Sequence, residues 1–346
     1  MREQTPEEKP YRFVPFPSEQ PLREKGAGQD RLHGGKWSGW FDIEFRTLMP
    51  VQVATGITDF VRTRSGERLA LTQAMVKRRL LDDPRRSGIA VVLPGSSLKG
   101  ALRSLVEALS RSCVLVVGGL TRSALPRHLT RCANPDNLCP ACRLFGSQDY
   151  QGQVSIADAS VPSGSRVIMG TPLLWAPARS QGRGLPSRYL ERGRARGRKF
   201  YKHHRVASGP DPRVVIKQGV TIPTRITFTN LTSAELGLLV SALGCHPQYS
   251  FPIKLGAGKP IGMGSVEVNM QRVVLLSGSE GVQRAGRLGK AISKAECLEG
   301  EALKERLVEW TQQAEQEELL LTEQLEELAQ IFERSSLNTP APEGMY

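Results

Sequence analysis

The chain has 346 residues, a length that permits one large domain or two ordinary ones. No apolar run reaches the roughly 18 residues of a membrane span, and the charged start "MREQTPEEKPYRF" lacks a signal segment, which predicts a cytoplasmic protein with no membrane partner. The net charge is +13, but the segment from Glu296 onward carries 13 Glu against three basic residues, which leaves +23 on the rest. A positive charge this large on the residues before Glu296 predicts nucleic acid as a partner; a basic surface with no partner is the alternative.

The first half of the chain alternates strands, helices and irregular segments. Residues 1–36 are rich in Pro, Gly and charge and predict an irregular arm. "WSGWFDIEFRTL" (37–48) alternates as a strand does, and residues 69–81 predict a helix. "VVLPGSSLKGALRSLVEAL" predicts a strand at 89–93 that runs through Pro-Gly-Ser-Ser into a helix over about 97–110.

The second half adds three further predicted strand regions and two helices. Strands are expected at 152–161, as one or two strands within 213–230, and after a Gly-rich loop within 251–270. A helix is expected over 233–244, with Ser233 as its N-cap and Gly244 at its end. The Glu-rich segment 295–334 predicts a long helix, packed either on its own domain or on a partner subunit. This order indicates an α+β fold.

Three cysteines lie close together in "HLTRCANPDNLCPACRLFG". His128, Cys132, Cys139 and Cys142 follow the spacing H-x3-C-x6-C-x2-C, in which the Cys-x2-Cys turn offers two thiolates to one ion. The pattern therefore predicts a closed, structural zinc site rather than free cysteines that are near one another by chance. Cys113 is the alternative to His128 as the fourth ligand.

The segment "RYLERGRARGRKFYKHHR" combines cations with rings. Cations neutralise phosphates and aromatic rings stack on bases, so the segment predicts contact with single-stranded nucleic acid. The residues expected to take part are Arg196, Arg198, Lys199, Tyr201, Lys202 and His203. His203 and His204 are also weighed as a general acid and base for RNA cleavage.

Two further segments suit a phosphate chain. The Gly-rich stretch "KLGAGKPIGMG" has neither a Walker nor a dinucleotide-binding pattern. A simple turn-rich loop is the alternative, but Lys254 and Lys259 favour contact with an RNA backbone. At the Pro-Gly-Ser-Ser junction, Ser96 or Ser97 is expected to cap the helix, and the free amides there suit an anion.

Together, "LPGSSLKGALR", "CPACRLFG" with "GQVSIADA", and "KLGAGKPIGMGSVEV" resemble, in order, the hallmark segments of the RAMP superfamily of CRISPR-associated proteins. "KPYRFVPFP" and "GRKFYKHH" resemble more closely the type III-D branch and the type VII backbone subunit. The resemblance implies a ferredoxin-like, RRM-like palm with a thumb, a zinc-binding insertion and a long C-terminal helix. It also implies that Ser96, Ser97, Lys99 and Arg103 lie against the guide RNA.

The resemblance divides the chain into three parts: an N-terminal arm over 1–36, an RRM-like RAMP domain over 37–275, and an acidic helical extension over 276–346. Within the domain we expect the thumb at about 50–90, the zinc-binding insertion at about 113–146 and a basic insertion at about 176–209.

The expected function is that of a CRISPR RNA-binding backbone subunit of an antiviral, RNA-targeting effector complex. It would assemble with copies of itself and other CRISPR subunits, present the guide to target RNA, and leave cutting to a separate nuclease subunit. The alternatives are a target-RNA endonuclease that uses magnesium at Asp59, Asp82 or Asp83, and a metal-independent nuclease that matures CRISPR RNA. The region around these aspartates departs from the family pattern, which favours a subunit that is not an enzyme.

Overall fold

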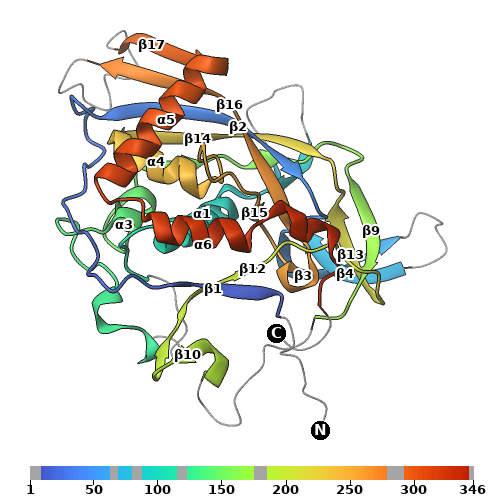
Figure 1. Cartoon of the computed structure of the whole chain (residues 1–346). Helices are drawn as coiled ribbons and strands as arrows, with labels where there is room; N and C mark the ends of the chain where they lie inside the picture. Colours follow the sequence, from blue (N-terminus) through green and yellow to red (C-terminus); the bar gives the residue numbers. More distant parts are fainter. Residues whose placement is uncertain are drawn as a thin grey trace.

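The computed structural model of the chain describes residues 9–62, 69–79, 88–114, 123–174, 185–278 and 292–342. A curled antiparallel sheet of six strands forms its main layer (Figure 1). Its strands are β2 (Trp37–Thr47), β7 (Val154–Ile156), β14 (Thr221–Leu231), β15 (Ile253–Lys254), β16 (Ser265–Gly278) and β17 (Ile292–Glu299). The spatial order is β15, β16, β2, β14 and β7, with β17 paired to the end of β16. The mixed α+β class predicted from the sequence is confirmed.

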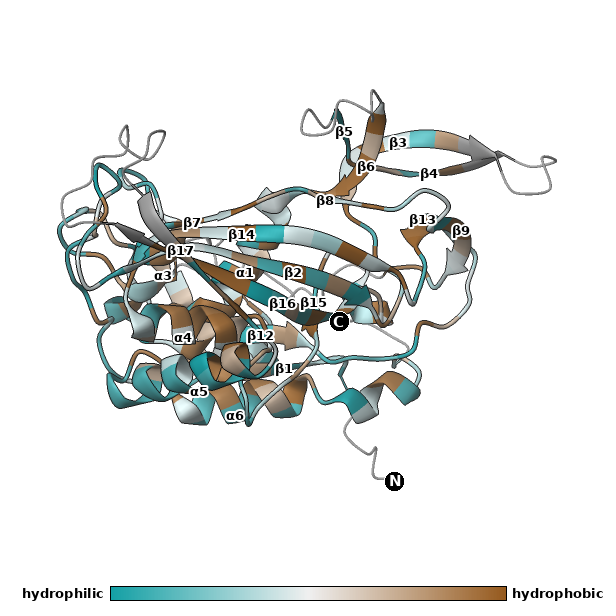
Figure 2. Ribbon diagram, turned by 90° about the horizontal axis from the view of Figure 1, so that it is seen from above, coloured by the Kyte–Doolittle hydropathy of each residue, from teal (hydrophilic) through white to brown (hydrophobic). Residues whose placement is uncertain are grey.

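Alternation along β2 explains why the sheet has one buried and one polar face. Phe41, Ile43 and Phe45 are almost completely buried, whereas Asp42 and Glu44 point to the other side. Successive side chains of a strand point to opposite faces, so a strand with this pattern covers a core on one face only. Figure 2 shows the helices gathered below the sheet and its opposite face left open.

Four helices cover the buried face: α1 (Gly95–Leu109), α4 (Ser233–Ala242), α5 (Gly300–Gln316) and α6 (Thr322–Ile331). α4 is buried along its whole length and packs against α5. A β carbon at Gly237 would lie 2.0 Å from the Trp310 carbonyl oxygen, so glycine allows the two helices to approach. The N-cap of α4 is Thr232, which forms a capping box with Glu235; the prediction of Ser233 was wrong by one residue.

The acidic C-terminal segment is not one helix. Its start pairs as β17 with β16, and α5 and α6 are separated by a break in which Glu318 has a φ of 53°. Trp310, Leu325 and Phe332 are buried in the shared core, so these helices pack on their own domain. Because the backbone of residues 292–299 finds partners on β16, tertiary pairing overrides the helical propensity of this stretch.

The thumb, defined here as β3 (Ala54–Arg62), β4 (Leu69–Met75), β5 (Lys77–Arg79) and β6 (Ile89–Leu93), extends from the palm (Figure 2). β3 and β4 form a hairpin, while β5 and β6 form a sheet with β8 (Ala159–Ser160). The predicted helix over 69–81 was wrong over the described residues 69–79. Leu71 and Gln73 are exposed on either side of the buried Thr72, as expected of a strand whose successive side chains point to opposite faces, and these residues pair with β3.

The N-terminal arm was expected to be irregular, but part of it pairs with the basic segment, "RYLERGRARGRKFYKHHR". β1 (Tyr11–Pro15) and β12 (Gly197–Tyr201) form an antiparallel ribbon. Farther along, the arm pairs with the cysteine region through two hydrogen bonds between Glu24 and Leu138, of 3.0 and 2.7 Å. Sequence periodicity misses such a ribbon because each strand needs a partner that is distant in the sequence.

The remaining short elements connect these layers. They are α3 (Pro140–Phe145), β9 (Arg166–Thr171), β10 (Leu190–Glu191), β11 (Arg194–Ala195) and β13 (Asp211–Ile216). The strand expected at 152–161 is interrupted and forms β7 and β8, and the segment 213–230 forms β13 and β14. No helix in the described part of the chain is long and apolar enough to cross a membrane.

Candidate metal centre and basic groove

Cys113, Cys132, Cys139 and Cys142 bring their sulfur atoms within 4.8 Å of one another. The Cys113 sulfur lies 3.5 Å from that of Cys139 and 3.6 Å from that of Cys142. Zinc–sulfur bonds of about 2.3 Å in a tetrahedron place the sulfurs about 3.8 Å apart. All four cysteines are buried, so the cluster could bind one zinc ion as a closed site.

Local backbone structure gathers these sulfurs. Cys139 precedes α3, and its carbonyl accepts hydrogen bonds from the amides of Cys142 and Arg143, which closes the Cys-x2-Cys turn. The amide of Cys139 in turn donates to the Cys132 sulfur at 3.3 Å. Cys113 comes from the segment after α1, where the Ser112 hydroxyl accepts the amide of Ala141 at 3.1 Å. The Cys-x2-Cys turn and the C-terminal end of α1 are therefore fixed to each other.

His128 is not part of the cluster. It lies in a short 3-10 turn, Arg127–Leu129, and its Nε2 is 3.0 Å from the carbonyl oxygen of Pro17. The N-terminal arm therefore holds the imidazole, and Cys113 completes the cluster instead. The choice of His128 over Cys113 was wrong because sequence spacing cannot show that the chain returns to the end of α1.

The cluster has a positively charged neighbour. The Arg103 guanidinium donates to the Cys142 sulfur at 3.1 Å, to the Gly146 carbonyl at 2.6 Å and to the Glu107 carboxylate at 2.8 Å. Within the cluster, the hydrogen bond from the Cys113 thiol lowers the pKa of Cys132 and raises the pKa of Cys113. These partners hold the Arg103 guanidinium beside the cysteine cluster, and its contact with RNA stays a prediction.

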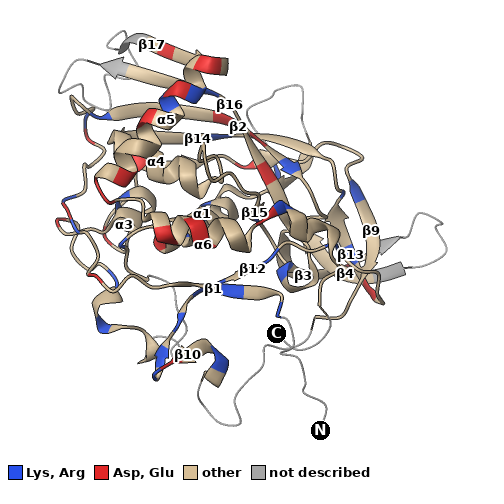
Figure 3. Cartoon of the chain, in the orientation of Figure 1, with Lys and Arg blue, Asp and Glu red and all other residues tan. Residues whose placement is uncertain are grey.

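A basic groove lies between α1, β12 and the Gly-rich loop. It is a cavity of about 160 Å³. Its lining is Ala101, Ser104, Leu105, Arg198, Lys199, Phe200, Tyr201, Lys254, Lys259 and Phe332. The structure thus brings together five residues that the sequence nominated from two distant segments. Figure 3 shows Lys and Arg on β1 and β12, with acidic residues on α5 and α6.

The two lysines of the Gly-rich loop have different roles. Lys254 is buried, and its ammonium donates to the carbonyls of Gly262 and Met263 at 3.0 Å each, so it fixes the loop from inside. Lys259 is only partly buried and makes no hydrogen bond or ion pair with any described residue. Burial lowers the pKa of Lys259, so an incoming anion would stabilise its charged form. Lys259 is therefore the better phosphate ligand.

Aromatic rings surround Lys199 on the outer face of the β1–β12 ribbon. Its Nζ lies 3.8, 4.7 and 5.0 Å from the ring centroids of Tyr11, Tyr201 and Tyr189 and donates to the Tyr189 hydroxyl at 2.9 Å. Arg196 lies over the ring of Phe13 at 6.0 Å. Sequence reasoning missed the rings of the arm, although the alternation of rings in "YRFVPF" could have indicated a strand with one aromatic face.

The N-terminus of α1 is only partly available to an anion. Ser96 and Ser97 are exposed, but the N-cap is Pro94 and no side chain caps the helix. The amide of Gly95 donates to the Asp158 carboxylate at 2.7 Å, so an acid of the chain already occupies the first turn. The prediction of a serine cap was wrong. Lys99 is partly buried, and its pKa is lowered by burial and then by Arg103.

The histidines of the basic segment point inward. His203 is completely buried, with Nδ1 2.8 Å from the Ser265 hydroxyl and Nε2 3.0 Å from the Pro252 carbonyl. Burial lowers the pKa of His203 to about 3, with Lys254 adding to the effect. His204 is buried as well, and Lys202 is partly buried with its amide donating to the Pro10 carbonyl. Both imidazoles are therefore turned away from solvent, and their contact with RNA and their role in RNA cleavage stay predictions.

The candidate catalytic aspartates are not gathered into a site. Asp59 is exposed on β3 opposite Thr72, and its carboxylate accepts the amide of Phe60 at 2.8 Å. Asp82 and Asp83 lie outside the described residues. In the described part of the chain, the cysteine cluster is the one group of three or more His, Cys, Asp or Glu that could hold a metal ion. A magnesium site at Asp59 has no support from these contacts.

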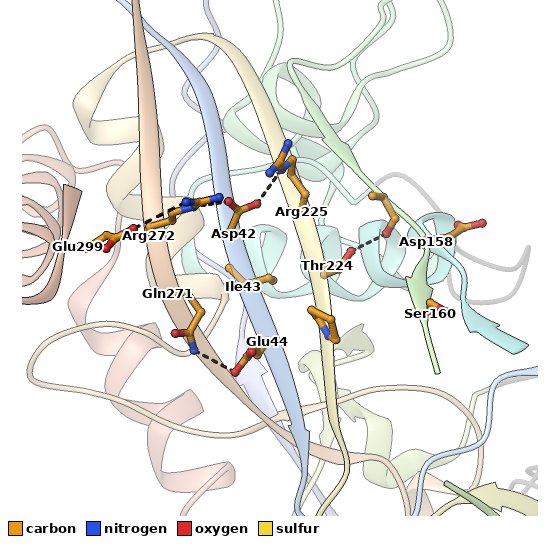
Figure 4. Close-up of a pocket in the computed structure, with 12 residues that line it drawn as sticks. Asp42, Ile43, Glu44, Asp158, Ser160, Thr224, Arg225, Gln271, Arg272 and Glu299 are labelled. Carbon is orange, nitrogen blue, oxygen red and sulfur yellow. Dashed lines mark hydrogen bonds and ion pairs between the residues drawn. The ribbon is translucent and has the colours of Figure 1, made fainter. Parts of the chain in front are cut away.

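The open face of the sheet carries a second, wider cavity of about 780 Å³ (Figure 4). Asp42 lies there between Arg225 and Arg272, with Nε–O distances of 2.7 and 2.6 Å. Burial would raise the pKa of Asp42, but the hydrogen bonds from both arginines outweigh it and lower the pKa. The lining of this cavity holds four acids, Asp42, Glu44, Asp158 and Glu299, against two arginines, so it lacks the cationic chemistry of the groove.

Fold and sites together define an α+β protein with a protruding thumb, a four-cysteine cluster able to hold zinc, and a basic groove. A family model of the RAMP superfamily matches residues 60–267, more than half of the chain. The chain therefore belongs to the RAMP superfamily and is a CRISPR-associated RAMP protein. No curated protein matches it.

Proposed function

We propose that this protein is a CRISPR RNA-binding backbone subunit that lies along the guide RNA and presents it to target RNA. The observation that carries the proposal is the basic groove. Cations from the basic segment and the Gly-rich loop, which are far apart in the sequence, meet there beside α1. A phosphate chain satisfies several such cations at once, and Lys259 has no competing acid among the described residues.

The groove favours a single strand over a duplex. Tyr201 and Phe200 line it, and the ring cluster around Lys199 continues the surface along the ribbon. Aromatic faces stack on unpaired bases, whereas duplex bases are already stacked on one another. A guide presented for pairing is single-stranded, so the combination of cations and rings suits it.

The thumb supports a subunit that works in an assembly. Ile57, Phe60, Leu71 and Ile89 of the thumb are each more than half exposed. Exposed apolar side chains that gather on one element indicate a contact surface. We propose that the thumb contacts the next copy of the subunit or another CRISPR subunit on the same RNA.

We also propose that the cysteine cluster holds a structural zinc ion through Cys113, Cys132, Cys139 and Cys142. The four buried thiols and their spacing support a tetrahedral ion, which would supply no open position for catalysis. Its role would be to fix a polar insertion to the end of α1. Metal analysis of the purified protein distinguishes zinc from iron, the other ion common in four-sulfur sites.

The palm is further proposed to be ferredoxin-like. Within it the chain runs β2, α1, β7, β14, α4 and β16, and the sheet order of its strands is β16, β2, β14 and β7. This β-α-β-β-α-β order supports the assignment. We retain the proposal of a type III-D-like or type VII complex in the cytoplasm, in which a separate nuclease subunit cuts target RNA.

The test of this function is RNA binding by the full chain. Fluorescence anisotropy with a labelled oligouridylate should show an affinity that falls steeply as salt rises, because counterions are released when phosphates meet the groove. A duplex RNA of the same length should bind more weakly. Equal affinity for duplex and single strand would contradict a groove of cations and rings. Cleavage of target RNA by complexes that contain no other nuclease would contradict the non-catalytic assignment.

A further inference from the structure

A continuous chain of charged side chains connects the cysteine cluster with the wall of the basic groove. It begins at the Cys142 sulfur, passes to the Arg103 guanidinium at 3.1 Å, and continues to the Glu107 carboxylate at 2.8 Å. The other oxygen of Glu107 pairs with Arg198 of β12, which lines the groove. Glu107 is 3% exposed, and the Arg198 side chain is 18% exposed, so solvent screens this chain only weakly.

The charge of the cysteine cluster depends on its metal. Four thiolates around Zn²⁺ carry a net charge of about −2 and are fixed in a tetrahedron, whereas without the ion nothing holds the four sulfur atoms in one geometry. In the metal-bound form the Arg103 guanidinium therefore faces a fixed anion, and hydrogen bonds from charged donors to metal-bound ligands hold those ligands in place. In the metal-free form the Cys142 sulfur offers Arg103 no such fixed partner, and the carboxylate of Glu107 stands between two guanidinium groups.

Glu107 can transmit the difference between the metal-bound and metal-free forms because its carboxylate pairs with both Arg103 and Arg198. An arginine held firmly against the thiolates offers a fixed donor to one oxygen of Glu107, which leaves the other oxygen aligned on Arg198. Arg198 pairs on β12 with Val14 of β1, so its position also fixes the register of the ribbon that carries Lys199. A loosened Glu107 would free Arg198 to turn toward solvent and would change the shape of the groove.

We propose that Arg103 and Glu107 are positioning residues that couple the metal centre to the RNA groove, so that zinc and single-stranded RNA each strengthen the binding of the other. This inference rests on the proposed function, because it needs both ligands to bind. Coupling between two sites is reciprocal, so the factor by which RNA tightens zinc must equal the factor by which zinc tightens RNA. We expect a factor of at least about fivefold, the lower end of ordinary coupling.

The experiment measures that factor in the full chain. The dissociation constant for zinc is measured by competition with a chelator, with and without a saturating concentration of oligouridylate. The expected result is tighter zinc binding in the presence of RNA. The reciprocal measurement is the RNA affinity of zinc-loaded and zinc-stripped protein, with circular dichroism confirming that the stripped protein remains folded.

Two variants separate coupling from general stabilisation by a bound ligand. Glu107→Gln keeps the shape of the side chain but removes the charge that both arginines share, and it should reduce the factor to about one while both ligands still bind. Glu235→Gln is the matched control. Glu235 is a buried carboxylate that pairs with Arg143, next to Cys142, at 2.7 Å, and glutamine keeps the capping box. This variant should keep the full factor.

Each outcome decides between these ideas. A factor of one in the wild-type chain, with zinc and RNA both bound, overturns the coupling and leaves the proposed function standing. If Glu107→Gln keeps the full coupling factor, or if Glu235→Gln loses it, the coupling does not pass through Arg103 and Glu107, and the proposal is overturned. Failure of the wild-type chain to bind zinc or RNA at all would overturn the proposed function, and the inference with it. Should Glu107→Gln fail to fold, Arg103→Gln replaces it and removes the charge between Cys142 and Glu107, with the same expected loss.

Discussion

The two sides of α1 carry the same kinds of residue in opposite environments. On the cysteine side, Arg103 and Glu107 pair with each other and contact a buried cluster of four thiols. On the groove side, Lys199 and Lys259 face a cavity, and Lys259 finds no acid among the described residues. The first arrangement is complete without any other macromolecule, whereas the second lacks its anions. Burial and pairing, rather than residue type, therefore separate the structural side from the binding side.

Removing the metal ligands should have the largest effect on this comparison. Structural zinc contributes folding free energy, on the order of 10 kcal/mol in zinc-finger peptides, and here we expect it to act on the segment around α3 rather than on the whole fold. Changing Cys139 and Cys142 together to serine should abolish zinc binding and unfold the region around α3. Metal analysis and thermal melting measure the two effects. Cys297→Ser is the control, since Cys297 is exposed and lies outside the cluster. Full zinc content in the double variant would reject the assignment.

Acid should destabilise the protein through His203, which is completely buried although it lies in the basic segment. The folded chain keeps His203 neutral down to a pH of about 3, whereas the unfolded chain protonates it near 6.5. The unfolded state then binds more protons between these values, so this contribution is complete above pH 6.5 and is lost as the pH falls toward 3. It amounts to about 5 kcal/mol at most, as an order of magnitude.

His203→Gln tests this titration. The amide can donate to the Pro252 carbonyl and accept from the Ser265 hydroxyl, as the neutral imidazole does. Urea unfolding measured across this pH range should show a shallower loss of stability in the variant. His246→Gln is a useful comparison, because burial lowers the pKa of His246 to about 4 as well. An identical pH profile for wild type and His203→Gln would show that His203 is not buried and neutral.

Replacing the groove lysines should weaken RNA binding, and Lys199→Ala should also lower stability because it removes three cation–π contacts and a hydrogen bond to Tyr189. Lys199→Ala with Lys259→Ala should weaken oligouridylate binding roughly tenfold, equivalent to about 1.4 kcal/mol. The slope of log affinity against log salt should fall by about 0.7 for each phosphate that the variant no longer neutralises. Lys304→Ala is the control, since Lys304 is exposed on α5 and pairs with Glu301. If Lys304→Ala weakens RNA binding as much as the double variant does, RNA binds through the overall positive charge of the protein and not through the groove.

Asp59→Asn should have the smallest effect. Asp59 is exposed on the thumb, and its carboxylate accepts the following amide, which an asparagine side chain also accepts. We expect a change in unfolding free energy within about 0.5 kcal/mol and no change in RNA affinity. If the wild-type chain cleaves target RNA with magnesium and this variant does not, Asp59 is a catalytic residue. That result would contradict the assignment of a subunit without nuclease activity.

The sequence predicted those features that depend on local pattern. Alternation in residues 37–48 located β2, the Pro-Gly-Ser-Ser junction located the start of α1, and the Cys-x2-Cys turn located the metal region. Features that depend on distant partners were missed. The strand β1 needs β12, and the fourth cysteine needs the return of the chain past α1. Of the predicted helix at 69–81, the described residues 69–79 form strands because β3 and β6 supply hydrogen-bond partners.

The candidate site shows the same limit. The family resemblance nominated Arg103 as an RNA ligand, and local sequence patterns nominated His203 and Lys259, because each is cationic or aromatic and lies in a suggestive motif. The structure gives Arg103 a sulfur and a carboxylate, gives His203 a hydroxyl and a carbonyl, and leaves Lys259 facing the groove. Which cation is already paired is a tertiary property, and periodicity does not contain it.

The central claim is that several copies of this chain assemble on one single-stranded RNA through the basic groove. Native mass spectrometry of the full chain, mixed with a CRISPR RNA transcript and with increasing salt, tests it most directly. The account predicts complexes with more than one zinc-bearing copy per RNA, which dissociate as salt rises and are depleted by Lys199→Ala with Lys259→Ala. Protein that remains free of RNA at low salt, or complexes that the double variant leaves unchanged, would contradict it.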